Sequence, residues 1–346
     1  MKRFLLPAIQ VLVTVGLLAW IFRNPEQNRL MLTALTQAQI GWIIPGIVAI
    51  GIAFVLQTQR WRMLMAVQGI HMSWWRTFRL MMVGAFFNLF LFGSTGGDVI
   101  KIFYAMRETA TKKSAAFLSV MVDRIVGLLA LILVTTVICA ISFRELTAQP
   151  VTAALLSTLG IILGGSLAMV VAGFLVDRLQ LAHRLPAWLP LHAKITEMAA
   201  AFSVYARDGR TLLATLGLSI PAHLLIFSAF YFASMAFSAQ LQAAGHAVLS
   251  LMDVFTVMPI ISTITALPIS LSGLGVREVL FQQLFGALFG TPTDIAKVVS
   301  LTGFAMLLFW SLVGGVVYLL YRPTGVHLSD IEKAVDAVEE DVERSA

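Results

Sequence analysis

The sequence predicts an all-α polytopic membrane protein with about six full transmembrane helices and two broken helical segments. Of the 346 residues, 59% are hydrophobic and 12% are charged, whereas soluble domains carry roughly 25% charged residues. Several apolar runs are long enough to cross about 30 Å of hydrocarbon. Two further apolar stretches are interrupted by glycine-rich sequences that carry opposite charges.

Six apolar runs have the length of about 20 residues that a transmembrane helix needs. They are residues 4–22, 40–57, 115–143, 152–176, 211–238 and 297–321. The first run follows Lys2 and Arg3, as in a signal peptide. It is too long for one, however, and no Ala-x-Ala cleavage site follows it. We therefore expect a first membrane span there.

Basic residues predict the orientation, because loops on the cytoplasmic side carry an excess of Lys and Arg. With a cytoplasmic N-terminus, sixteen of the 24 basic residues fall on the cytoplasmic face. The opposite face receives four, namely Arg23, Arg29, Arg144 and Lys297. We expect a multi-pass protein of the bacterial inner membrane with both termini in the cytoplasm.

The interrupted stretches are residues 78–100 and 253–290. Their interruptions read Phe92-Gly93-Ser94-Thr95-Gly96-Gly97-Asp98-Val99-Ile100-Lys101 and Leu267-Pro268-Ile269-Ser270-Leu271-Ser272-Gly273-Leu274-Gly275-Val276-Arg277-Glu278. Irregular backbone at membrane depth is tolerated where protein buries it or where it lines a wet cavity. We interpret each stretch as a re-entrant pair of half-helices; the alternative is a full crossing with a kink. With six full spans the two pairs enter from opposite faces, as in an inverted-topology repeat.

Both interruptions contain residue types that suit an anionic group. In the first, Ser94 or Thr95 would cap a helix that begins near Gly97, and such helix N-termini bind phosphates. Asp98 would compensate the helix dipole, and Lys101, one turn later, would pair with it. In the second interruption, Pro268 would end a helix, and Ser270 and Ser272 would supply hydroxyl groups. Arg277 offers a planar fork for phosphate or carboxylate. Glu278 would either neutralise Arg277 in the empty state or titrate.

Five other charged residues lie in or beside apolar runs, at three places in the chain. Asp123 and Arg124 are adjacent, so on a helix they point about 100° apart and should reach separate partners. They would either form salt bridges that hold the helix bundle together or line the substrate site. We interpret Arg60-Trp61-Arg62 as an interfacial end of the second span, and Asp253 as a helix cap. The predicted substrate-binding residues are Ser94, Thr95, Gly96, Gly97, Asp98, Lys101, Asp123, Arg124, Ser270, Ser272, Gly273, Gly275, Arg277 and Glu278.

The chain divides into a transmembrane domain, residues 1–322, and an acidic cytoplasmic tail, residues 323–346. Residues 178–210 are too polar to span the membrane, and their apolar positions recur at helical spacing, which predicts an interfacial helix on the cytoplasmic headgroups. The single cysteine, Cys139, leaves no disulfide framework or thiol-based metal site. We find no H-E-x-x-H, no G-x-S-x-G, no nucleotide loop and no nucleic-acid module in the sequence. We expect neither a cofactor nor enzyme activity.

Several motifs together resemble a known family. Phe86-Phe87-Asn88 precedes Gly93-Ser94-x-Gly96-Gly97-Asp98, and Ser119-Val120-x-x-Asp123-Arg124-x-x-Gly127-Leu128 follows. With Leu267-Pro268-Ile269-Ser270 and Gly273-Leu274-Gly275-Val276-Arg277-Glu278, residues 5–320 resemble the membrane region of the lysylphosphatidylglycerol synthase/flippase family. Family members usually read Leu-Pro-Gly before the first motif, where this chain has Leu91-Phe92-Gly93.

The resemblance implies movement of a polar-headed lipid between leaflets, the lipid being an anionic phospholipid or a polyprenyl or glycolipid phosphate. Lysyl transfer is not expected, because only the acidic tail follows the last span. The alternative is a membrane scaffold or accessory subunit that does not transport and serves a separate lipid or glycolipid synthase. A weaker alternative is an intramembrane transferase with Asp98 or Glu278 as base. The oligomeric state is open.

Overall fold

Four long helices dominate the computed structural model, which describes residues 5–90, 96–107, 113–148, 150, 152–154, 156–165, 203–205, 207–267 and 269–320. The four are long and apolar enough to cross a membrane. They are Ile40–Val67 (the short η2, Ile40–Trp42, continued by α3, Ile43–Val67), α6 (Lys113–Ile141), α10 (Gly209–Met235) and α14 (Thr293–Leu320). The chain is therefore a polytopic, all-helical membrane protein in its described part.

These four helices confirm four of the six predicted spans. The predicted span 4–22 corresponds to the 17-residue helix α1 (Leu5–Ile21). The predicted span 152–176 is described only as far as residue 165 and includes the shorter apolar helix Thr152–Gly165. Full crossings at these two positions stay predictions. The acidic tail lies outside the described residues, as does most of the expected interfacial helix 178–210.

Asp208, near the end of that segment, belongs to the described part of the chain. Asp208 caps α10, and its carboxylate accepts hydrogen bonds from the backbone N–H of Thr211 at 3.1 Å and from its hydroxyl at 2.8 Å. These bonds favour the ionised form and hold the pKa of Asp208 below its usual value. The membrane helix therefore starts at Gly209, with an ionised cap in front of it.

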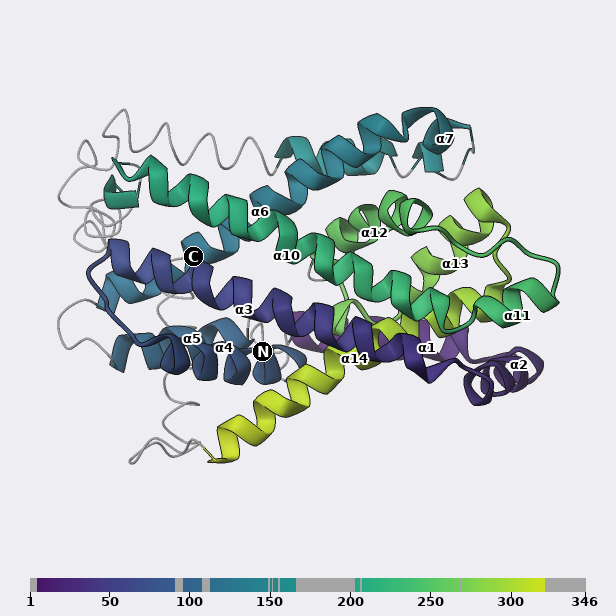
Figure 1. The fold of residues 1–346 in the computed structure, drawn as a ribbon, viewed down its shortest axis with the longest axis horizontal. Helices are drawn as coiled ribbons and strands as arrows, with labels where there is room; N and C mark the ends of the chain where they lie inside the picture. Colours follow the sequence, from purple (N-terminus) through teal and green to yellow (C-terminus); the bar gives the residue numbers. More distant parts are fainter. Residues whose placement is uncertain are drawn as a thin grey trace.

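Helices α3 and α10 run antiparallel along the length of the bundle (Figure 1). At one end the rings of Trp42 and Phe232 stack with centroids 6.2 Å apart. At the other end the Tyr205 hydroxyl donates to the Leu64 carbonyl at 3.0 Å. We call these the Trp42 end and the Tyr205 end. Short helices α2 (Pro25–Thr36), α7 (Phe143–Thr147) and α11 (Ser238–Ala243) lie at the Trp42 end.

Helix α14 packs against α3 and α10 through glycines. Gly46 and Gly51 of α3 face the side chains of Met306 and Trp310, and Gly303 of α14 faces Phe230 of α10. Trp310 also donates its indole N–H to the Ile47 carbonyl at 2.8 Å. Because a methyl group at these glycines would overlap its neighbour, the helices approach more closely than larger residues would permit.

The two interrupted stretches lie at opposite ends of the bundle (Figure 1). Helices α4 (Trp74–Phe90) and α5 (Gly96–Arg107) lie side by side at the Tyr205 end. Helices α12 (Leu251–Thr265) and α13 (Val276–Phe289) lie at the Trp42 end, with the short η4 (Leu271–Gly273) between them. Both predicted stretches are thus helix pairs with a break, and residues 91–95 and Pro268 lie outside the described part.

Helix α12 runs antiparallel to α6 from the Trp42 end inward. The hydroxyls of Ser142 and Thr256 lie 3.0 Å apart, and those of Thr135 and Thr263, deeper in the bundle, lie 3.2 Å apart. Asp253 takes part in capping α12, although the N-cap residue itself is Ser250. Its carboxylate accepts from the Ser250 N–H at 2.8 Å, and the Ser250 hydroxyl accepts from the Asp253 N–H at 3.1 Å, which is a capping box.

Candidate functional site

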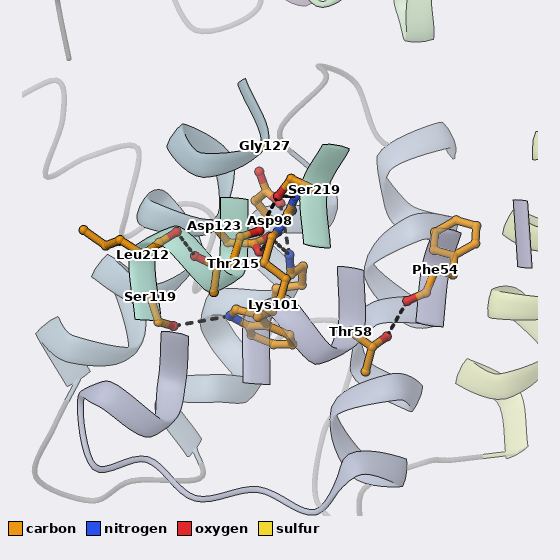
Figure 2. Close-up of polar contacts among 12 residues, drawn as sticks. Phe54, Thr58, Asp98, Lys101, Ser119, Asp123, Gly127, Leu212, Thr215 and Ser219 are labelled. Carbon is orange, nitrogen blue, oxygen red and sulfur yellow. Dashed lines mark hydrogen bonds and ion pairs between the residues drawn. The ribbon is translucent and has the colours of Figure 1, made fainter. Parts of the chain in front are cut away.

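A connected set of ion pairs lies inside the bundle where α3, α5 and α6 meet. Asp123 accepts a hydrogen bond from Arg60 Nε at 2.7 Å with one carboxylate oxygen and from Lys101 Nζ at 3.2 Å with the other. All three side chains are buried, and Asp123 is only 3% exposed. Figure 2 shows Lys101, Asp98 and Asp123 close together. The free-energy cost of burying these charges is partly offset because each charge has a partner of opposite sign.

The set continues through the first interrupted segment to Arg124. Arg124 Nε donates to one Asp98 oxygen, and Lys101 Nζ lies 3.9 Å from the other. Asp123 and Arg124 therefore have separate partners, as predicted from their 100° separation. We call Arg60, Asp98, Lys101, Asp123 and Arg124 the Asp123 cluster. It contains three cations and two carboxylates, and the Arg124 side chain is 46% exposed.

Neutral neighbours fix the positions of the two buried cations. The Lys101 ammonium lies 4.7 Å from the centre of the Trp61 ring, which favours a cation there. Arg60 Nη1 donates to the Ser219 hydroxyl of α10 at 3.0 Å. The interfacial interpretation of Arg60 and Trp61 is wrong, because both are buried in the protein interior. The sequence signal for this pairing was the presence of opposite charges, such as Lys101 and Asp123, in separate apolar runs.

Two glycines leave room for the same cations. A methyl group at Gly84 of α4 would lie 2.9 Å from Lys101 Cγ, and one at Gly127 of α6 would lie 3.2 Å from Arg60 Nη1. The Gly127 carbonyl also lies 3.0 Å from His223 Nε2. Sequence reasoning did not assign Gly84 or His223 to the site, because their proximity depends on how α4 and α10 pack.

The second interrupted segment holds a separate, neutral pair. Arg277 Nη2 donates to Glu278 Oε1 at 2.7 Å, and the Ser300 hydroxyl donates to the same oxygen at 2.9 Å. Arg277 also lies over the Phe304 ring, 4.6 Å from its centre. The side chains of Arg277 and Glu278 are 7% and 0% exposed. Glu278 therefore pairs with Arg277, in keeping with one of its two predicted roles. We call Arg277, Glu278 and Ser300 the Arg277 cluster.

The turn before this cluster has a left-handed backbone at three positions. Ser272, Gly273 and Gly275 have φ values of 50°, 75° and 83°. These conformations explain the two glycines, since residues with a Cβ rarely adopt them. The Gly275 N–H donates to Glu278 Oε2 at 2.6 Å, which ties the turn to the Arg277 cluster. Ser270 is 4% exposed, and its hydroxyl has no hydrogen-bond partner among the described residues.

The two interrupted segments meet at Asn88, near the end of α4. The Gly97 N–H donates to Asn88 Oδ1 at 2.9 Å, and the Ser272 hydroxyl donates to the Asn88 carbonyl at 3.4 Å. Gly96, beside Gly97, is the first residue of α5. The expected caps Ser94 and Thr95 lie outside the described residues. A cap contributed by α4 was not predicted, although Asn is a favoured capping residue.

The structure thus groups most of the predicted site residues into two clusters and one turn. Asp98, Lys101, Asp123 and Arg124 belong to the Asp123 cluster, whereas Arg277 and Glu278 form the other cluster. In the described part of the chain, no ion pair joins one cluster to the other. That same part contains no group of three His, Cys, Asp or Glu side chains that could hold a metal ion.

A comparison with protein families identifies the chain. The family described as the lysylphosphatidylglycerol synthase TM region matches residues 8–315, nearly the whole chain. The protein therefore belongs to this family, and the resemblance seen in the sequence is confirmed. The match covers the membrane region of the family. The family is linked to phospholipid handling in membranes. No curated protein matches the chain significantly.

Proposed function

We propose that the protein is a flippase that moves a lipid with a phosphate-bearing head between the leaflets of the membrane. The observation that carries this proposal is the Asp123 cluster, which places charges inside a membrane bundle and reaches the surface at Arg124. A charge in the bilayer centre costs several kcal/mol or more, so such residues mark pathways for ions or polar substrates. Membership of the lysylphosphatidylglycerol synthase TM region family supports a lipid as the substrate.

The positions of the interrupted helix pairs support this function. We propose that α4–α5 is re-entrant from the cytoplasm and α12–α13 from the outside, so that the two form an inverted-topology repeat. Arg60, Lys101 and Lys297 are buried, so they are removed from the count that set the orientation. Fourteen basic residues then remain on the proposed cytoplasmic face against three on the other. The excess still favours cytoplasmic termini in a bacterial inner membrane.

The two clusters suit different steps. We assign first contact with the lipid phosphate to Arg124, because its side chain is half-exposed. A guanidinium can bind a phosphate with the same paired hydrogen bonds that it makes to a carboxylate. The phosphate would replace Asp98 as the partner of Arg124, with Lys101 close by. Arg277 would bind a headgroup only after Glu278 separates from it, because the two side chains are hydrogen-bonded here. Ser270, with its buried hydroxyl, is a hydrogen-bond donor for the same group.

Reconstitution of the purified protein into liposomes tests the proposal. A fluorescent phosphatidylglycerol analogue reports movement between leaflets when an impermeant reductant quenches the outer leaflet. We expect wild-type protein to make the inner pool accessible. Arg124→Gln should slow this by about tenfold or more, because a charge-assisted hydrogen bond contributes roughly 1.5–3 kcal/mol. Arg76→Gln, at an exposed position before the interrupted segment, is the matched control and should behave as wild type.

Two results would contradict the proposal. Folded wild-type protein that moves no phosphate-bearing lipid would favour the scaffold or accessory subunit, because such a protein needs a synthase partner. Equal rates for Arg124→Gln and wild type would remove Arg124 from the site. Native mass spectrometry of the purified protein then identifies the lipid that it retains.

A further inference from the structure

Asn88 forms hydrogen bonds with both interrupted segments. Its side-chain oxygen accepts from the Gly97 N–H at 2.9 Å, at the start of α5. Its backbone carbonyl accepts from the Ser272 hydroxyl at 3.4 Å, in the turn before α13. Gly97 and Ser272 are 175 positions apart in the chain, yet one residue of α4 contacts both. Asn88 therefore lies at the junction of two segments that enter the bundle from opposite ends.

The requirements of helix ends explain both bonds. The first N–H groups of an α-helix have no partner within the helix, and neither do its last carbonyls. The Asn88 side chain supplies an acceptor for α5, and the Asn88 carbonyl in the last turn of α4 receives the Ser272 hydroxyl. Ser272 reaches it from a left-handed conformation, with φ 50° and ψ 26°. Loss of either bond would remove a hydrogen bond from a backbone group inside the bundle, where few other polar groups can replace it.

Close packing restricts how far each side can move alone. A methyl group at Gly97 would overlap the Gly84 carbonyl oxygen and lie 2.6 Å from Asn88 Cγ, so α5 fits against α4 without spare room. On its other side, α4 is held by α14, because a methyl group at Gly314 would overlap the Met82 carbonyl. The start of α5 therefore cannot shift away from α4 without breaking the bond to Asn88.

The turn before α13 has a second attachment. The Leu271 N–H donates to the Thr14 hydroxyl of α1 at 2.9 Å. With the bond from Ser272 to Asn88, the turn is held between α1 and α4. Displacement of Asn88 would remove one of these two attachments, whereas the attachment to α1 would stay.

We infer that Asn88 is a positioning residue that couples the start of α5 to the turn at residues 270–275, so that the two interrupted segments shift together. The inference deepens the proposed function and rests on it, because the coupled segments carry Asp98 and Arg277. Coupling of this kind makes the two clusters respond to one lipid headgroup in concert. Thermodynamic linkage requires the effect to be reciprocal.

Cysteine accessibility measures the coupling without any need for transport. In a Cys139→Ala background, Ser270→Cys reports on the turn and Ile100→Cys reports on α5; both positions are buried. We expect Asn88→Ala to raise the rate at which a small thiol reagent labels the Ser270→Cys reporter about threefold to tenfold. This is the factor expected from loss of one hydrogen bond. Ser272→Ala should raise labelling of the Ile100→Cys reporter by a similar factor.

Two controls separate coupling from general loosening. Asn88→Asp keeps an acceptor for the Gly97 N–H and should restore protection of the Ser270→Cys reporter. A Ser234→Cys reporter in α10, at a position 1% exposed, should stay protected in every variant. The inference is overturned if Asn88→Ala leaves the Ser270→Cys reporter protected. It is also overturned if this reporter is labelled as fast in Asn88→Asp as in Asn88→Ala, or if labelling of the Ser234→Cys reporter rises in parallel. None of these results depends on lipid movement, so the proposed function succeeds or fails separately.

Discussion

Arg277 and Glu278 are adjacent in the chain and buried together. The free-energy cost of burying either charge therefore depends on the presence of the other. Removal of one partner from a buried ion pair leaves an uncompensated charge and costs about 3–5 kcal/mol, whereas replacement of both partners by neutral groups is often tolerated. We therefore expect Arg277→Met to lower the midpoint of thermal unfolding in detergent strongly. The double variant Arg277→Met with Glu278→Gln should recover most of that loss.

The control for this prediction is Glu278→Gln alone, which leaves the Arg277 charge buried and should also be destabilised. Equal stability of Arg277→Met and wild type would contradict the pairing. In liposomes the refolded double variant then isolates the role of Arg277 in lipid movement. A simple Arg277→Ala substitution cannot do this, because loss of folding and loss of binding would be confounded.

The residue types of the site could be predicted from the sequence, but several of their partners could not. Opposite charges inside apolar runs identified Asp123 and Arg124, and helical geometry assigned them to separate partners. Arg60 was misinterpreted because a basic residue beside Trp at the end of an apolar run is also typical of the membrane interface. Its partner, Asp123, is 63 positions away, and only the packing of α3 against α6 brings the two together.

At the scale of elements, the contact between α4 and α5 depends on Gly97. We expect Gly97→Ala to force the two helices apart, since the added methyl would overlap the Gly84 carbonyl. The displacement should also move Asp98 and Lys101, which follow within the next turn of α5. Thermal unfolding in detergent should therefore shift well below that of wild type, and lipid movement should be lost.

Gly217→Ala is the matched control, because it makes the same change within α10 at a position with no atom within 4 Å of the new methyl. Alanine is the better helix former by about 1 kcal/mol, so this variant should be as stable as wild type or more stable. A Gly97→Ala variant that unfolds no earlier than Gly217→Ala would contradict the close contact between α4 and α5.

The interruptions could be predicted as elements, although their internal geometry could not. Glycine-rich sequence in an apolar run marks a break, and the bounds of α12 and α13 confirm one between residues 265 and 276. A left-handed conformation at Ser272 has no signal in the sequence, because it arises from attachments to α1 and α4. The cap from Asn88 was missed for a related reason, since capping residues are sought next to the helix that they cap.

At the scale of the whole molecule, the sequence predicted a membrane bundle with two interrupted helix pairs that enter from opposite faces, and in the folded bundle the pairs lie at opposite ends. Apolar run length identified the four long helices directly. Helix α1 and the helix Thr152–Gly165 adjoin residues outside the described part of the chain, so the full extent of these two predicted spans is not described. The count of full spans, on which the orientation depends, therefore calls for a direct test of topology.

Single cysteines on the two interrupted pairs provide that test in a Cys139→Ala background. Ser73→Cys lies just before α4, and Thr293→Cys lies just after α13; both positions are exposed. Because the pairs lie at opposite ends of the bundle, a membrane-impermeant maleimide added to intact spheroplasts should label only Thr293→Cys. Permeabilised spheroplasts should label both at similar rates. Labelling of both cysteines from one side would contradict entry from opposite faces and, with it, the inverted-topology repeat.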